Sequence, residues 1–76
     1  MASQLRRFHG TVVSWKPEAG FGFVKIDMLG QQAMLHLNSF DQAIGGDMIK
    51  RDMRITFYIE NHSRGLRCIR SEIIES

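Results

Sequence analysis

Apolar and polar side chains alternate most regularly in residues 53–60, "MRITFYIE". Every second residue is apolar, beginning with Met53, and the residues between are arginine, threonine, tyrosine and glutamate. Such alternation is typical of a β-strand with one buried face. Residues 66–74, "LRCIRSEII", predict a last strand after an "NHSRG" turn, but the phase of their alternation slips between Cys68 and Ile73. The slip indicates a β-bulge at an undetermined position in that strand.

Three further strands are predicted in the N-terminal half. Residues 5–15 are rich in β-branched and aromatic types, residues 20–28 contain "FGFVKI", and residues 32–37 read "QAMLHL". The segments between them, "KPEAG" and "LGQ", carry the proline and glycine typical of turns. Strands that follow one another through short turns pair as an antiparallel meander.

The stretch between the third and fourth predicted strands differs in character. Asn38 or Ser39 is placed to cap a single helical turn that runs through Ile44 and ends at Gly45, and the rest is predicted to be loop. Five short strands in 76 residues favour a barrel, because closure removes exposed sheet edges. We therefore expect one all-β domain, residues 1–76, with a core from about residue 5 to residue 74.

The second predicted strand separates its aromatic residues from its aliphatic ones. Successive side chains of a strand point to opposite faces, so Phe21, Phe23 and Lys25 share one face, opposite the intervening glycine, valine and isoleucine. A chain of this size buries only about 60% of the surface that its unfolded form exposes. Two rings on the face opposite the aliphatic core residues therefore need an explanation.

The third predicted strand adds to both faces. The residues expected in the core are Ala33, Leu35 and Leu37. On the other face, a tight turn would bring Met34 and His36, together with Gln32, beside Phe21 and Phe23.

The margins of this face carry an indole and two cations. Trp15 ends the first predicted strand and is expected at the edge of the patch, with the alternative that its ring plugs one end of the barrel. Lys16 and Lys25 flank the patch. The net charge is +2, and the whole excess lies in residues 1–40, which hold four basic and two acidic groups. This weak basic bias favours an anionic partner.

Exposed rings edged by cations suit single-stranded nucleic acid. Every base has a π-face that can stack on a ring, and lysines meet the phosphates. Two alternatives stay open: the aromatic pair can be ordinary packing in the core or between strands, and an exposed apolar face can equally mediate weak homodimerisation or binding to another protein.

The motifs of this face resemble those of the cold-shock domain. "GTVVSWKPEAGFGFV" is similar to that family's opening segment with its RNP1-like motif, and "AMLHLNSF" is similar to the RNP2-like motif that follows. "MRITFYIE" and "SRGLRC" resemble the fourth strand and the entry to the fifth, so the resemblance spans about residues 8–71. An RRM is disfavoured, because only one strand precedes "GFGFV".

The resemblance implies a five-stranded antiparallel OB-fold barrel that acts as an RNA chaperone with little sequence preference. It assigns base stacking to Phe21, Phe23 and His36. Met34 and Leu37 stand where the family has phenylalanines, and a long-loop aromatic has no match near Gly45–Gly46. Two family lysines are replaced by Val13 and Ala19. These losses imply weaker binding, which Arg64, Arg67, Arg6 and Arg7 are candidates to offset.

Other function classes are disfavoured. The histidines His9, His36 and His62 are dispersed, with no cysteine or carboxylate at metal-ligand spacing, and "AIGGDMIK" does not match a phosphate-binding loop. We expect neither an enzyme nor a cofactor. With one cysteine, no apolar run of roughly 20 residues and no secretion signal, we expect a cytoplasmic protein without a membrane partner.

Overall fold

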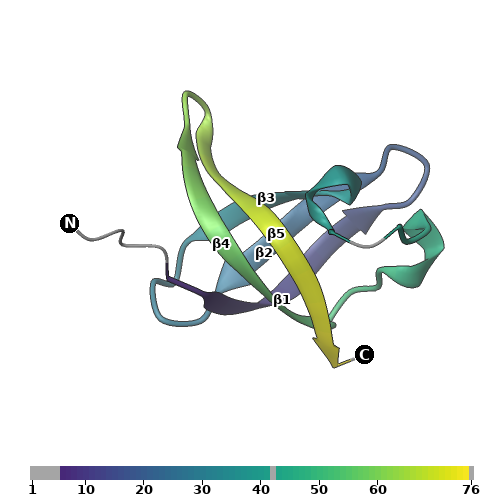
Figure 1. Cartoon of the computed structure of the whole chain (residues 1–76), viewed down its shortest axis with the longest axis horizontal. Coiled ribbons are helices and arrows are strands. Elements are labelled where there is room, and N and C mark those ends of the chain that lie inside the picture. Colours follow the sequence, from purple (N-terminus) through teal and green to yellow (C-terminus); the bar gives the residue numbers. More distant parts are fainter. Residues whose placement is uncertain (1–5, 42, 76) are drawn as a thin grey trace.

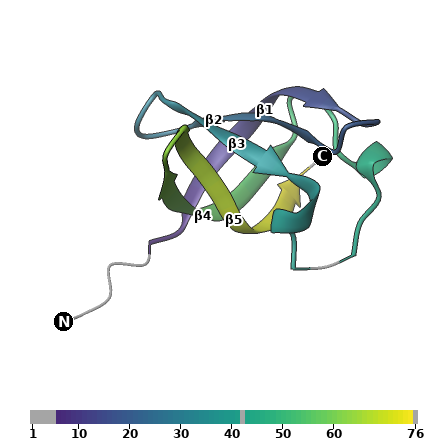
Figure 2. The same cartoon turned by 90° about the horizontal axis from the view of Figure 1, so that it is seen from above.

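Five β-strands close into a small barrel in the computed structural model, which describes residues 6–41 and 43–75 (Figures 1 and 2). The strands are β1 (Phe8–Lys16), β2 (Phe21–Ile26), β3 (Gln32–His36), β4 (Arg54–His62) and β5 (Gly65–Glu75). Two short 3₁₀ helices, η1 (Leu37–Ser39) and η2 (Gly46–Met48), lie between β3 and β4. In the described part of the chain, no helix is long and apolar enough to cross a membrane.

The barrel is mixed rather than purely antiparallel. Its strand order is β1-β2-β3-β5-β4, and every neighbouring pair is antiparallel except β3 and β5, which run parallel and align at Met34 and Arg67. A closed ring with an odd number of strands cannot alternate direction everywhere, so one parallel joint is unavoidable. The prediction of a five-stranded OB-like barrel is confirmed, with this one correction to the pairing.

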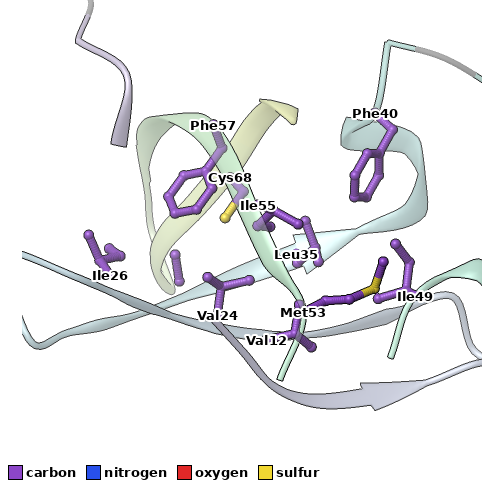
Figure 3. Packing of buried hydrophobic residues seen from close by; sticks show 11 residues of the cluster. Val12, Val24, Ile26, Leu35, Phe40, Ile49, Met53, Ile55, Phe57 and Cys68 are labelled. Atoms are coloured by element: carbon purple, nitrogen blue, oxygen red, sulfur yellow. The ribbon is translucent and has the colours of Figure 1, made fainter. Parts of the chain in front are cut away.

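The core fills the barrel with apolar side chains that range in size from alanine to phenylalanine (Figure 3). The fully buried members come from all five strands: Val12, Val24, Ile26, Ala33, Leu35, Ile55, Phe57 and Cys68. Phe40, Ile49 and Met53 add to the core from the connection between β3 and β4. The alternation predicted for residues 53–60 is confirmed up to Phe57. Ile59 is only half-buried, because β4 there runs on into the β4–β5 hairpin that projects past the barrel (Figure 1).

The predicted slip in the last strand is confirmed and can now be placed. Thr56 lies opposite Glu72 while Tyr58 lies opposite Ile69, so β5 holds one more residue than β4 across this interval. Arg70 adopts a positive φ of 51° at this bulge. The register of β4 against β5 shifts once more between Arg54 and Ile55, and another irregularity separates Val12 from Ser14 in β1; the sequence had indicated neither.

The helical turn predicted to run through Ile44 is wrong. The chain makes only the 3₁₀ turn η1, after which Phe40 is extended and bridges Ser71. Burying the Phe40 ring in the core requires this extended backbone, which ends the turn. Residue 42, within the predicted turn, and residue 5, where the first strand was predicted to begin, lie outside the described residues.

Candidate nucleic-acid interface

Two cross-strand pairs form the centre of the candidate site. Phe21 lies directly opposite His36 and Phe23 directly opposite Met34. The alternation predicted that these four side chains share a face, and the structure adds which of them are paired. Phe23 is 38% exposed and Met34 is 37% exposed, while Phe21 and His36 are half-buried. The residues between them on both strands are buried in the core. We call these four side chains, Phe21, Phe23, Met34 and His36, the outer face.

Lysines lie on two sides of the outer face. Lys16 is opposite Phe21, and its Nζ lies 6.0 Å from the centroid of that ring, within reach of a cation–π interaction. Lys25 is exposed and lies opposite both Thr11 and Gln32, one step beyond Phe23 along the same face. The predicted flanking of the rings by cations is therefore confirmed.

Trp15 lies on the inner side of β1, away from the outer face. It is opposite the buried Gly22, packs against the core and donates a 2.7 Å hydrogen bond from Nε1 to the carbonyl oxygen of Gly46. The irregularity between Val12 and Ser14 sets this phase of β1. The structure thus favours the alternative structural role for the indole and does not bring it beside the two phenylalanines.

Gly22 separates the two rings because β1 passes very close to it. A Cβ at this position would lie against the carbonyl oxygen of Ser14 and 2.8 Å from the Cα of Trp15. Backbone atoms of a paired strand cannot easily move aside, so only glycine fits. The glycine keeps β1 tight against β2 at the bulge, so that the flanking phenylalanines are held at fixed positions.

The imidazole of His36 has a fixed orientation. Its Nδ1 accepts a 3.1 Å hydrogen bond from the backbone N–H of Asn38, at the start of η1. In the neutral ring the proton is therefore on Nε2, which leaves an N–H donor on the other edge. Leu37, predicted to be a core residue, is instead half-buried in η1, because β3 ends at His36.

The β4–β5 hairpin adds a second wall beside the outer face. An open pocket of about 570 Å³ lies between the two, lined by Phe23, Gln32 and Met34 on one side and by residues 62–67 on the other. Arg64 is exposed at the tip of the hairpin, and Arg67 aligns with Met34 across the parallel joint. Sequence reasoning missed the contributions of His62 and Leu66, because nothing local indicates that β5 lies next to β3.

The N-terminal arginines are placed elsewhere. The guanidinium of Arg7 lies 4.8 Å from the centroid of the Tyr58 ring and 3.5 Å from a carboxylate oxygen of Glu72, so it lies against β4 and β5 away from hairpin residues 62–67. Arg6 lies over the Phe8 ring at 5.7 Å. Neither is among the residues that line the pocket beside the outer face.

The arrangement offers stacking surfaces, cations and hydrogen-bond donors. Within the described residues, no group of three or more histidine, cysteine, aspartate or glutamate side chains is gathered to hold a metal ion. Compared with known proteins, the chain matches no protein-family model and no curated protein.

Proposed function

We propose that the protein binds single-stranded RNA or DNA by stacking unpaired bases on the outer face, with little dependence on sequence at the rings themselves. One observation carries this proposal: the half-buried Phe21 and the exposed Phe23 project from the sheet on the side away from the core, next to Lys16 and Lys25. A partner with flat, apolar faces and a negative backbone matches both the rings and the lysines beside them.

Stacking supplies the favourable energy. A base stacked on an aromatic side chain contributes about 1–3 kcal/mol by alanine substitution. The thioether of Met34 is polarisable and adaptable, and it lies opposite Phe23 where it can contact the same base. Binding of this kind favours unpaired strands over weak secondary structure, which is the action of an RNA chaperone and requires no energy source. The resemblance to cold-shock domains supports the same function.

Alanine substitution of both rings tests the proposal. Anisotropy of a labelled oligouridylate would be measured with the wild type, with Phe21→Ala/Phe23→Ala, and with Ile74→Ala as a matched control. Ile74 is 49% exposed near the end of β5, so the control removes exposed apolar surface outside the outer face. The double variant is expected to bind at least about tenfold more weakly, and the control to bind normally. Equal affinities for three folded proteins would refute base stacking on these rings.

Self-association through the same face is the competing function, because exposed apolar patches also form oligomer interfaces. Light scattering after size-exclusion chromatography separates the two. A dimer that becomes a monomer in Phe21→Ala/Phe23→Ala, together with no oligouridylate binding, would assign the outer face to protein contacts. A monomer that binds the oligonucleotide supports the proposal above.

A further inference from the structure

Arg67 differs from the other half-buried arginines of the described chain in forming no ion pair within 4 Å, although Glu60 lies opposite it in the register of β4 and β5. Arg7 is paired with Glu72 at 3.5 Å and Arg54 with Asp27 at 2.7 Å. The guanidinium of Arg67 instead has His62 as its hydrogen-bond partner, with Nη1 at 3.4 Å from the ring Nε2. A partly desolvated cation is costly unless an anion or a set of acceptors pairs with it. Arg67 is therefore a candidate for binding a ligand.

The surroundings of Arg67 suit a flat, apolar group. Its neighbour across the β3–β5 joint is Met34. The pocket beside it has the apolar side chains of Phe23, Met34 and Leu66, and its polar lining also includes Gln32, His62, Ser63 and Arg64. A volume of about 570 Å³ is within the range of roughly 300–1,000 Å³ typical of small-molecule sites. A few polar groups on an apolar lining select orientation in such sites.

We propose that this pocket takes one guanine base of the bound strand, with the guanidinium of Arg67 donating two hydrogen bonds to O6 and N7. The inference rests on the proposed function and adds base selection to it. Arginine has donors only, and guanine presents two adjacent acceptors on this edge, whereas adenine presents an acceptor beside a donor. The apolar surface of Phe23, Met34 and Leu66 favours a base over a phosphate, since the flat face of a base can cover it and a phosphate cannot. Arg64, exposed at the hairpin tip, is the cation placed for the backbone.

A guanine scan tests the inference. An oligouridylate of about seven nucleotides, a length within the site sizes of OB folds, would be compared with versions carrying one guanine, or one adenine, at each position. The wild type is expected to bind at least one guanine version about 5- to 150-fold more tightly than the matching adenine version, the range for a bidentate pair. Guanine replaced by 7-deazaguanine, which lacks the N7 acceptor, should lose most of this gain.

Arg67→Lys and Arg67→Gln separate base recognition from a phosphate contact. Lysine keeps the charge but not the planar two-pronged geometry, so it should lower the ratio of guanine affinity to adenine affinity by a larger factor than it lowers the affinity for oligouridylate. Thermal unfolding verifies that both variants fold. If either variant instead weakens binding equally for every oligonucleotide, Arg67 contacts phosphate and the inference fails.

Each failure has its own signature. If the wild type shows no guanine preference but binds oligouridylate through Phe21 and Phe23, only the inference of guanine recognition by Arg67 is refuted. A wild type that binds no oligouridylate overturns the proposed function.

Discussion

Trp15 and Gly46 are joined by a 2.7 Å hydrogen bond between the indole Nε1 and the backbone carbonyl oxygen. The bond links the end of β1 to η2, in the connection that leads from β3 to β4. It is the main polar contact that holds a ring which otherwise packs on the core. Trp15 therefore stabilises the fold, and its expected effect on ligand binding is small.

Trp15→Phe should lower the free energy of unfolding by about 1 kcal/mol. The substitution keeps an aromatic ring but removes the donor, and the net value of one hydrogen bond is about 0.5–1.5 kcal/mol. Urea denaturation measures the loss, and anisotropy with oligouridylate should show an affinity within about twofold of the wild type. A tenfold weaker affinity with unchanged stability would place the indole in the interface instead.

Gly22→Ala should destabilise the protein severely, by more than about 2 kcal/mol, because its Cβ meets backbone atoms of Ser14 and Trp15. Gly45→Ala is the matched control: its φ is −87°, and its Cβ would meet only the Oδ1 of Asp47, at the mobile end of a side chain. Thermal unfolding followed by circular dichroism compares the two. Similar melting temperatures would show that β1 can move away from β2 at the bulge.

Binding to oligouridylate should weaken as salt rises. For about three phosphate contacts, the slope of log affinity against log salt is about −2 on a single strand. Lys16→Gln removes a cation beside Phe21, so the slope should become shallower by about 0.7. Lys50→Gln, exposed in the connection before β4, serves as the control and should leave the slope unchanged. A slope near zero in the wild type would exclude phosphate contacts.

The ion pair between Asp27 and Arg54 should make stability depend on pH in the acid range. Two hydrogen bonds, of 2.9 and 2.7 Å, run from the guanidinium to the two carboxylate oxygens and hold the pKa of Asp27 below its ordinary value of 3.8. The stabilisation is therefore complete above that value and is lost as the pH falls through the lowered folded-state pKa. Because both side chains are partly exposed, Asp27→Asn should cost only about 0.5–1 kcal/mol at pH 7.

Urea denaturation of the wild type and Asp27→Asn at a series of pH values checks this. The difference between the two proteins should shrink as the carboxylate is protonated. A difference that persists unchanged at pH 2 would point to packing rather than charge.

The thiol of Cys68 should be inert in the native protein. Burial raises its pKa from 9.0 to about 12, so thiolate, the reactive form, is scarce and shielded. An aromatic disulfide reagent at pH 8 should label the chain promptly in urea and only slowly without it. Since the unfolded thiol ionises first, the same shift should reduce stability as the pH rises above 9.0. Prompt labelling of the native protein would indicate local opening of β5.

The shared face of β2 and β3 could be predicted because it depends on local information. Side chains alternate with a period of two, so Phe21, Phe23, Met34 and His36 were expected on one side of the sheet. The exact pairs depend on where the turn begins, and β2 ends at Ile26 rather than at residue 28. The position of Trp15 could not be predicted in this way. A bulge in "TVVSW" reverses the phase of β1, and no glycine or proline in that stretch indicates one.

The contribution of hairpin residues 62–67 to the pocket could not be predicted from local sequence, for a different reason. Arg67 was a candidate only as one of several basic residues, because its position beside Met34 depends on how the barrel closes. Closure joins strands that are far apart in the chain, and the pairing arises from the packing of the whole core. The extended path at Phe40, which replaced the expected helical turn, is likewise dictated by burial of its ring.

The parallel joint between β3 and β5 passes through the proposed ligand surface, with Met34 on one margin and Arg67 on the other. A nucleic-acid strand that touches both residues would bridge β3 and β5 across this joint. Binding would then stabilise the closed barrel. The melting temperature and the resistance to proteases should therefore rise with the concentration of unpaired RNA or DNA.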